Sequence, residues 1–375
     1  MVLRVKKAIY GLKQSGREWY IEVSNGLAKL GLKPTFSDPS VFVNEDRSLI
    51  VGLYVDDMII IGPILDVVNT FKKEFGKLYS IKDLGEIHSC LGLIITRDRA
   101  SRTLTISQRK YAQEIVQEFL GDSDQIDPTP TGGIQTLGKA KQNEPRADII
   151  LYLRAIGKLM FLQRGTRPDI TFPICRLAQF CSDPTIRHWN CVLRVIRYIS
   201  GTLNYCIRFG SAERLQGIKG FSDSDYAGDP EDRRSTYGFI FILCGGAIAW
   251  TSKKQRSVST STTEAEYVAL CQTSKQAVWY SGLLQDIGYS KYLENDFTVP
   301  LFCDNQAAMA LAENPENHAR SKHIDVQFHY IRQLVAYNKV TITYCPTSHM
   351  VADALTKPLK LSTFRTCQKG MVWTG

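Results

Sequence analysis

The sequence predicts a multidomain protein that combines an α+β part, a helical middle and a mixed α/β part. Three observations lead to this fold class. The chain has 375 residues, which is enough for two or three domains at about 150 residues each. Strand-like and helix-like patterns alternate in the first and last parts, whereas the middle is helical. Hydrophobic residues make up 44% and charged residues 22%, a globular composition that excludes a disordered tail and a collagen-like fibre.

The first part, residues 1–104, indicates a small sheet with helices on one side. Its pattern begins with helical spacing of apolar residues up to Leu30, and the helix is expected to stop at Gly31. The order that follows is typical of an α+β arrangement. The β-rich runs are 41–43, 49–55, 58–61 and a pair within 91–107, with a helical stretch over 64–78.

The second part, residues 105–215, is predicted to be helical with one interruption. The stretch 127–145 is rich in Pro, Gly, Thr and Lys and has no periodicity, which predicts an exposed linker. In the clearest helix after it, Asp183 is the expected N-cap and Pro184 the first helical residue. An apolar stripe marks one face of this helix. The opposite face carries three arginines, Arg187, Arg194 and Arg197.

The third part, residues 216–375, indicates a mixed α/β domain. Early hairpins followed by strands and helices in alternation favour a sheet with helices packed on it. The predicted strands are 218–222, 237–243, 247–251, 299–303 and 340–345, and the predicted helices are 264–287, 305–313 and 325–337.

The positive charge of the chain is concentrated in one segment. The net charge is +9. Residues 153–215 alone hold ten Lys and Arg against three Asp and Glu. Because arginine binds phosphate through two parallel hydrogen bonds, the segment favours a nucleic-acid partner. A solvated arginine-rich face explains the same charge equally well, and net charge alone does not separate nucleic acid from an anionic membrane surface.

Cysteines and hydropathy indicate an intracellular, soluble protein without a membrane partner. None of the ten cysteines forms a C-x-x-C pair, which excludes zinc-ribbon and thioredoxin-like sites and favours reduced, mostly buried thiols. The longest uncharged apolar stretch, 238–250, is too short for a membrane helix, which needs about 20 residues.

Two sets of carboxylates are candidates for metal binding. The first is the pair Asp56 and Asp57, at a tight turn between two apolar strands in Tyr54-Val55-Asp56-Asp57. Such a turn places both side chains at one rim of a sheet, where two-metal phosphoryl transfer requires rigid oxygen ligands. An ordinary hairpin with an Asp-Asp turn is the alternative.

The second set comprises four acidic residues from four different elements of the third part. They are Asp223, Glu264, Asp304 and Asp353, with intervals of about 40 to 50 residues between them. Carboxylates that converge from strand ends and helix starts could hold two cations. Each also has a structural alternative: Ser261 and Glu264 match the capping box S-x-x-E, and Asp304 and Asp353 are placed to cap or charge a helix start. Asp225 and Glu266 compete for the same ligand positions.

These motifs, in their order along the chain, resemble the reverse transcriptase and ribonuclease H of copia-type LTR retrotransposon Pol polyproteins. The resemblance covers essentially the whole chain. The matching segments are Tyr10-Gly11-Leu12-Lys13-Gln14, Ser37-Asp38-Pro39, Tyr54-Val55-Asp56-Asp57, Lys82-Asp83-Leu84-Gly85-Glu86, Phe221-Ser222-Asp223, Thr263-Glu264-Ala265-Glu266-Tyr267, Cys303-Asp304-Asn305-Gln306, Ser321-Lys322-His323-Ile324-Asp325 and Ala352-Asp353-Ala354-Leu355-Thr356-Lys357-Pro358.

The resemblance implies a role for each part of the chain. Residues 1–104 would be part of a polymerase palm with Asp56 as its main metal ligand, 105–215 the thumb and connection, and 216–375 a ribonuclease H. The second carboxylate set would hold Mg²⁺, or Mn²⁺, and act on RNA–DNA hybrids. An RNA template and a DNA primer would be the partners of the palm. Implied nucleic-acid contacts are Lys13, Gln14 and Gln306, beside the arginines of the helical middle.

The segment before Tyr10 departs from the family pattern. A further palm aspartate, within D-x-x-x-A-F, is expected upstream of Tyr10, and the residues present there do not contain it. We therefore expect this polypeptide to lack polymerase activity by itself and to retain ribonuclease H activity. The alternatives are a non-catalytic nucleic-acid-binding remnant and an enzyme whose upstream segment comes from a longer transcript. The resemblance implies a cytoplasmic location in virus-like particles for an intact element, or a nuclear one, and leaves the oligomeric state open.

Overall fold

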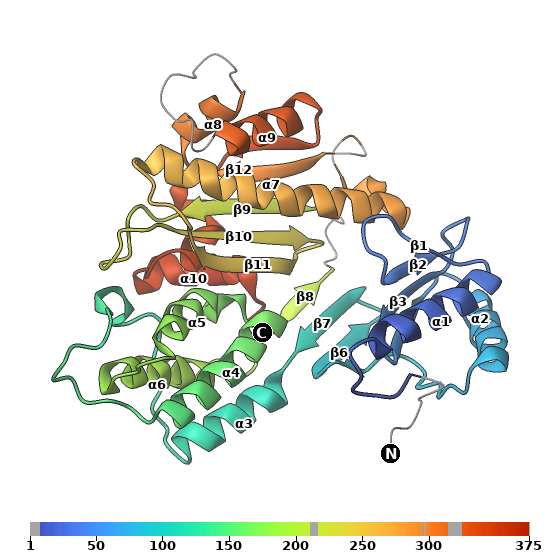
Figure 1. The fold of residues 1–375 in the computed structure, drawn as a ribbon, viewed down its shortest axis with the longest axis horizontal. Coiled ribbons are helices and arrows are strands. Elements are labelled where there is room, and N and C mark those ends of the chain that lie inside the picture. The colour runs from blue at the N-terminus through green and yellow to red at the C-terminus, as the bar shows by residue number, and fades with distance from the viewer. Residues whose placement is uncertain (1–7, 211–216, 294, 296–297, 314–324, 375) are drawn as a thin grey trace, which may run out of the picture. The chain divides into compact units, whose positions relative to one another are not determined.

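The computed structural model describes residues 8–210, 217–293, 295, 298–313 and 325–374. The chain forms two compact units: unit 1 comprises residues 1–87 and 279–291, and unit 2 comprises residues 88–278 and 292–375. Both units combine helices with strands (Figure 1), which confirms the predicted α+β and α/β multidomain class. No helix in the described ranges is both long and apolar enough to span a membrane. Among the described residues, the cysteines form no disulfide bond.

Unit 1 is a four-stranded antiparallel sheet in the order β1-β2-β3-β4 with two helices packed on it. The apolar stripes of the helices are buried against the strands, so that Leu27, Phe71 and Phe42 share one core. This burial drives the unit to form, at about 25 cal/mol per Å² of apolar surface. The elements are α1 (Ser15–Lys29), β1 (Lys33–Pro34), β2 (Val41–Val43), β3 (Ile50–Tyr54), β4 (Asp57–Ile61) and α2 (Leu65–Leu78).

A segment from far along the chain completes unit 1. Residues 279–291, which include the last turns of α7 (Thr262–Asp286), belong to this unit. The indole Nε1 of Trp279 donates to the carbonyl of Ser37 at 2.9 Å, and the amide of Ser37 donates to the carboxylate of Asp286 at 2.9 Å. The Ser37-Asp38-Pro39 motif is therefore held by residues that the sequence pattern assigned to the third domain.

Unit 2 begins with a second antiparallel sheet in the order β5-β6-β7-β8. Its first three strands are β5 (Ser89–Cys90), β6 (Leu93–Asp98) and β7 (Thr103–Ser107), and β8 (Ile207–Phe209) follows the helical segment. The boundary between the units lies after Ile87 rather than after residue 104. The reason is the pairing of β7 with β8, which ties residues 88–107 to the helical segment and which no local pattern shows.

The apolar stripe predicted for the clearest helix is confirmed in α6, which spans Ile186–Ser200. The start of this helix differs from the prediction. Thr185 is the N-cap of α6, because its side chain accepts from the amide of His188 while the His188 ring accepts from the amide of Thr185. The predicted cap Asp183 instead binds Arg146 at 2.6 Å. The helices are α3 (Arg109–Leu120), α4 (Ile149–Gly165), α5 (Thr171–Leu177) and α6 (Ile186–Ser200), with short 3-10 turns η1 (Ile134–Thr136), η2 (Pro168–Ile170) and η3 (Ala178–Phe180).

The third element of unit 2 is a five-stranded sheet in the order β11-β10-β9-β12-β13. The hairpin strands β9, β10 and β11 are antiparallel, whereas β12 is parallel to both β9 and β13. The strands are β9 (Lys219–Ser224), β10 (Thr236–Leu243), β11 (Gly246–Lys254), β12 (Val299–Cys303) and β13 (Val340–Tyr344).

Helices cover both faces of this sheet. Figure 1 shows α7 lying along the sheet, and Tyr267 of α7 shares a core with Cys303 of β12. The opposite face joins the core of the helical segment, where Ile240 and Ala247 belong to the same cluster as Val195 of α6. The remaining elements are η4 (Ser290–Tyr292), α8 (Gln306–Glu313), α9 (Asp325–Ala336), η5 (Thr347–His349), η6 (Val351–Leu355) and α10 (Leu361–Met371).

A buried ion pair stabilises the helical segment and joins it to α10. The guanidinium of Arg167 forms two hydrogen bonds to the carboxylate of Asp169, at 2.9 and 2.8 Å. The hydroxyl of Tyr198 also donates to Asp169 and accepts from Gln368 of α10. Because every partner is buried and bonded, the desolvation cost of the charges is offset. The α/β sheet and the helical segment are thus parts of one compact unit.

Candidate functional site

Asp56 lies in the tight turn between β3 and β4, and Asp57 begins β4. Tyr54 pairs with Asp57, so Val55 and Asp56 form a two-residue turn, and both carboxylates are exposed at the rim of the unit 1 sheet. Val55 has φ 52°, a left-handed conformation that is strained for a β-branched residue. Such strain persists only where the surrounding structure imposes it, and it is common at functional sites.

Two contacts from the segment before and within α1 hold this turn. The indole Nε1 of Trp19 donates to the carbonyl of Val55 at 2.7 Å. The hydroxyl of Tyr10 donates to the carboxylate of Asp56 at 3.3 Å. Lys13 and Gln14 are exposed in the same segment, and Gln14 is the residue at the N-cap of α1. The structure therefore brings the segment that begins at Tyr10 into contact with the turn that carries Asp56 and Asp57.

The main carboxylate cluster lies in unit 2, where β9, α7, β12 and η6 meet. Ligand atoms of Asp223, Asp304 and Asp353 lie within 4.8 Å of one another, and so do those of Glu266, Cys303 and Asp304. Asp223 lies near the end of β9, Asp304 directly follows β12, and Asp353 lies in η6. Three of the four predicted ligands are thus gathered by elements far apart in sequence.

Glu264 is not part of either ligand group. Glu266 instead provides the carboxylate that was predicted to come from Glu264. The Glu264 carboxylate accepts from the amide and hydroxyl of Thr260, at 2.8 and 2.6 Å. The Glu264 amide donates to Ser261 Oγ at 3.1 Å. These are the bonds of a helix N-terminus, so the capping alternative describes Glu264. The competing residue Glu266 instead contributes to the carboxylate cluster.

Lys357 and Thr356 belong to the cluster and were not predicted as site residues. The Lys357 ammonium lies 3.0 Å from an oxygen of Asp353 and 3.5 Å from an oxygen of Asp223. The Thr356 hydroxyl donates to Asp223. Lys357 follows Asp353 by four residues, a spacing that brings side chains together on a helical turn and that could have suggested the pair.

Burial and mutual repulsion make this cluster receptive to cations. Burial, with the neighbouring charge of Asp223, raises the pKa of Asp353 to about 7. Burial and the charges of Asp223 and Asp304 also raise the pKa of Glu266 well above its usual range. One oxygen of Glu266 is buried with no hydrogen-bond partner among the described residues. A divalent cation would relieve both the repulsion and the missing bond.

The neighbouring Asp225 makes different contacts from Asp223. Its carboxylate accepts from the amide of Thr236, and its own amide donates to the carbonyl of Thr236 at 3.0 Å. Burial raises the pKa of Asp225 to about 6. Asp225 therefore holds the loop between β9 and β10 and does not belong to either ligand group.

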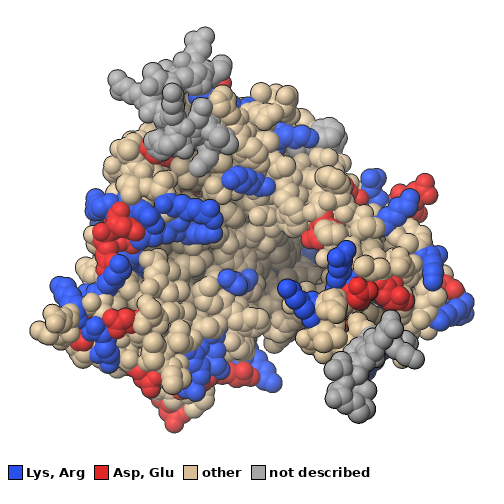
Figure 2. Space-filling view, viewed as in Figure 1, with Lys and Arg blue, Asp and Glu red and all other residues tan. Residues whose placement is uncertain are grey.

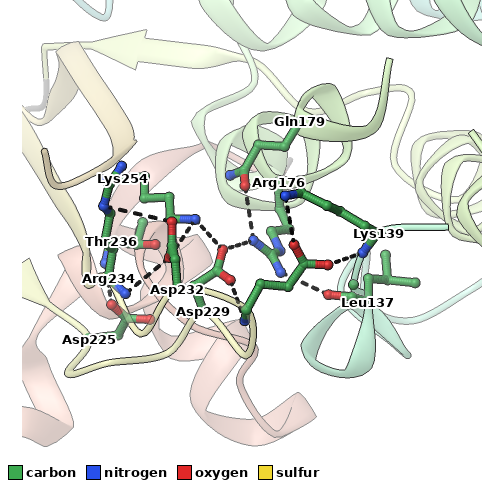
Figure 3. Close-up of polar contacts among 12 residues, drawn as sticks. Leu137, Lys139, Arg176, Gln179, Asp225, Asp229, Asp232, Arg234, Thr236 and Lys254 are labelled. Carbon is green, nitrogen blue, oxygen red and sulfur yellow. Dashed lines mark hydrogen bonds and ion pairs between the residues drawn. The ribbon is translucent and has the colours of Figure 1, made fainter. Parts of the chain in front are cut away.

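Figure 3 shows how the same loop is anchored to the helical segment. The Asp229 carboxylate binds Arg176 of α5 and Lys254 of β11, and Lys254 also lies 2.8 Å from Asp232. Although burial opposes ionisation of Asp229, hydrogen bonds from Lys254, from the amide of Glu231 and from Arg176 lower its pKa to about 2. This network fixes the loop that leaves the strand carrying Asp223.

Gln306 is exposed in the first turn of α8, two residues after Asp304. Asp304 accepts from the hydroxyl of Thr347 at 2.8 Å, which orients its carboxylate. The Ser321-Lys322-His323-Ile324 part of the remaining motif lies outside the described residues. Gln306 is therefore an exposed amide side chain close in sequence to Asp304 of the cluster.

The three arginines predicted to contact nucleic acid are engaged within unit 2. Arg187 lies 2.9 Å from Glu144, while Arg194 and Arg197 lie 3.0 and 2.7 Å from Asp127. These partners belong to the stretch 127–145, in which Thr131, Ile134 and Leu137 are buried. The prediction of an exposed linker is wrong, because the arginine face of α6 binds this stretch. On the face shown in Figure 2, many basic side chains likewise lie beside acidic ones.

Sequence comparisons give a consistent set of relatives. A family model described as reverse transcriptase (RNA-dependent DNA polymerase) matches residues 1–131. The chain is 35% identical to the retrovirus-related Pol polyprotein from transposon TNT 1-94 of Nicotiana tabacum, over 98% of this chain and 28% of that protein. It is 34% identical to the Pol polyprotein from transposon RE1 of Arabidopsis thaliana, over 97% of this chain and 24% of that protein. The chain thus spans about a quarter of the length of these relatives.

The chain is also similar to a shorter protein and to two solved structures. The chain is 33% identical to an uncharacterised mitochondrial protein of Arabidopsis thaliana, over 61% of this chain and 93% of that protein. The foamy viral protease-reverse transcriptase in complex with RNA/DNA hybrid has TM-score 0.43 and 13% identity, over 90% of this chain and 38% of that chain. The RNase H1 of Halobacterium salinarum NRC-1 has TM-score 0.27 and 17% identity, over 37% of this chain and 93% of that chain.

Proposed function

The chain belongs to the family of copia-type retrovirus-related transposon Pol polyproteins, and on this premise we propose that unit 2 is a ribonuclease H that hydrolyses the RNA strand of RNA–DNA hybrids. The observation that supports it most strongly is the convergence of Asp223, Glu266, Asp304 and Asp353 at one end of the five-stranded sheet. Four buried or half-buried carboxylates from four elements repel one another, so a fold keeps them together only for a compensating function.

The donor set fits Mg²⁺. Magnesium prefers carboxylate oxygens and retains several water molecules. The oxygens of Asp223, Asp304 and Asp353 form one half of the cluster, and the Glu266 carboxylate contributes to the other half. Asp304 belongs to both halves, which suits a pair of cations sharing one ligand. Mn²⁺ fits the same oxygens.

Each residue has a task that follows from its contacts. Bound Mg²⁺ supplies electrostatic stabilisation of the phosphate and activation of the attacking water. Thr347 and Thr356 hold the carboxylates of Asp304 and Asp223 in position through their hydroxyls. The Lys357 ammonium neutralises Asp223 and Asp353 in the metal-free protein, so we expect it to move aside when a cation enters.

Nucleic-acid recognition is proposed at the rim of this cluster. The exposed amide of Gln306 can both donate and accept hydrogen bonds, which suits the 2′-hydroxyls that distinguish RNA from DNA. The three arginines of α6 are already paired with Asp127 and Glu144. We therefore propose Gln306, rather than these arginines, as the residue that contacts nucleic acid.

For unit 1 we propose a role in RNA-directed DNA synthesis on an RNA template and a DNA primer. Asp56 and Asp57 provide two carboxylates at a strained turn, and Tyr10 and Trp19 fix it. A two-metal polymerase site needs a further bridging carboxylate from the palm.

The glutamate pair supplies the sharpest test of the ribonuclease H proposal. We predict that Glu266→Gln lowers Mg²⁺-dependent cleavage of a labelled RNA–DNA hybrid by at least about 100-fold, because an uncharged amide binds the cation poorly. The matched variant Glu264→Gln changes the same chemistry two residues away and retains cleavage within a few-fold. Equal losses in the two variants would count against Glu266 as a ligand. A wild-type protein that binds the hybrid in a salt-dependent manner without turnover would instead indicate a non-catalytic remnant.

A further inference from the structure

A cysteine thiol lies within the carboxylate cluster, although magnesium prefers oxygen ligands to sulfur. Ligand atoms of Glu266, Cys303 and Asp304 lie within 4.8 Å of one another. We propose that these three side chains form a binding site for a thiophilic divalent cation, Zn²⁺ or Cd²⁺, and that such a cation excludes Mg²⁺ from the hydrolytic site. The binding part of this proposal is independent of the proposed function, and the exclusion part rests on it.

The position of Cys303 is fixed by the sheet. It is the last residue of β12 and pairs with Tyr344 of β13, and its side chain is 0% exposed. Its sulfur accepts from the amide of Asn305 at 3.4 Å and donates weakly to the carbonyl of the same residue, at 3.9 Å. An amide that donates to sulfur is a contact that also supports a metal-bound thiolate. The thiol therefore lies at the boundary between the hydrophobic core and the carboxylates.

Glu266 provides a second, independent indication of a cation. This residue is only 6% exposed, and its Oε2 atom has no hydrogen-bond partner among the described residues. A buried carboxylate oxygen without a partner is costly, so it requires an explanation. A cation held by the Glu266 carboxylate, the sulfur of Cys303 and the carboxylate of Asp304 supplies one.

The chemistry of the ligands determines which metal binds where. Magnesium demands oxygen ligands and gains nothing from sulfur, so it needs the carboxylates of the cluster and not Cys303. Zinc and cadmium bind thiolate strongly, and one sulfur with two carboxylates and a water completes a tetrahedral set. Because Asp304 is common to both groups, and Glu266 is a proposed magnesium ligand, a thiophilic cation removes oxygens that the hydrolytic site needs.

Cadmium binding to the full 375-residue chain tests the site directly. We expect Cd²⁺ to produce an ultraviolet thiolate-to-cadmium charge-transfer absorption that saturates at one equivalent, and Cys303→Ser to remove it. The matched control is Cys271→Ser, which changes another buried cysteine of the same core outside both ligand groups. An absorption that persists in Cys303→Ser, or that is lost equally in Cys271→Ser, would overturn the proposal.

A second variant covers the case in which Cys303→Ser does not fold. Glu266→Gln keeps the thiol and removes one oxygen ligand, so it should weaken Zn²⁺ binding by about tenfold or more in calorimetry. Unchanged Zn²⁺ affinity in that variant contradicts the site.

The hydrolytic assay separates the failure of this inference from the failure of the proposed function. Micromolar Cd²⁺ should inhibit Mg²⁺-dependent hybrid cleavage by the wild type and by Cys271→Ser. A cadmium absorption without any hybrid cleavage supports the metal site and contradicts the ribonuclease H proposal. Cleavage that Cd²⁺ does not inhibit, without a cadmium absorption, does the reverse.

Discussion

At the residue scale, the two glutamates of α7 show where sequence patterns reach their limit. The pattern from Ser261 to Glu266 supports a capping role and a ligand role at once. Successive helical residues differ by about 100°, so side chains two positions apart point roughly 200° apart. Only one of Glu264 and Glu266 can therefore face the cluster. Which one does so depends on how α7 is rotated against β9 and β12, and that rotation is set by packing.

The pKa of Asp353 leads to a prediction about pH. The folded chain retains a proton at about pH 7 that an unfolded aspartate releases near pH 4. The contribution of Asp353 to stability should therefore be greatest below about pH 4 and should fall as the pH rises towards 7. We expect the metal-free protein to melt at a lower temperature at pH 8 than at pH 5, and Mg²⁺ to restore part of the loss at pH 8.

The control for this prediction is Asp353→Asn, which cannot titrate. Its melting temperature in a chelator should depend less on pH between 5 and 8 than that of the wild type. An unchanged pH dependence would mean that Asp353 does not hold the extra proton.

At the element scale, one glycine allows η6 to approach the sheet. Gly238 of β10 pairs with Asp223, and a Cβ at this position would lie 2.7 Å from the Cβ of Leu355 in η6. We predict that Gly238→Ala destabilises the protein by about 1–3 kcal/mol and weakens Mg²⁺ binding, because η6 carries Asp353. Chemical denaturation and metal titration measure the two effects.

Gly157 provides the opposite case in α4. A Cβ there meets no atom within 4 Å, so Gly157→Ala should stabilise the protein by up to about 1 kcal/mol and leave metal binding unchanged. If Gly238→Ala proves as harmless as Gly157→Ala, the close approach of η6 does not position Asp353.

The arginine face of α6 provides a second prediction at this scale. Asp127 binds both Arg194 and Arg197, and all three side chains are mostly buried. Asp127→Asn should lower the free energy of unfolding by about 1–3 kcal/mol and speed proteolysis within residues 127–145. Asp124→Asn, at an exposed position nearby, is the matched control. Equal digestion of the two variants would show that the stretch is held by other contacts.

These elements also show what sequence reasoning could and could not predict. Local patterns identified the strands of the five-stranded sheet and the apolar stripe of α6, because both depend on periodicity along a short segment. The partners of Arg187, Arg194 and Arg197 could not be predicted, because charge patterns do not distinguish a bound phosphate from Asp127 or Glu144. Local patterns also could not predict the pairing of β7 with β8 or the hydrogen bond from Trp279 to Ser37, because both join segments that are distant in sequence.

At the scale of the whole molecule, the chain consists of two compact units, each with its own carboxylates. Unit 1 presents Asp56 and Asp57 exposed at a strained turn, whereas unit 2 buries most of its cluster and completes it with Glu266. The excess positive charge of residues 153–215 contributes to the folding of unit 2, through ion pairs such as Arg167 with Asp169 and Arg176 with Asp229. The net charge was therefore a weaker indication of a nucleic-acid partner than the carboxylates were.

Hydrolysis of RNA within RNA–DNA hybrids is the activity that we propose for the unit 2 cluster. The most direct measurement is cleavage of a hybrid labelled on its RNA strand by the 375-residue chain with Mg²⁺, compared with the Asp304→Asn variant. Asp304 is chosen because it belongs to both ligand groups. We expect cleavage of the RNA strand by the wild type, no cleavage of a DNA duplex, and a loss of cleavage of at least about 100-fold in Asp304→Asn. Absence of cleavage by the wild type, or equal cleavage by Asp304→Asn, would contradict the proposal.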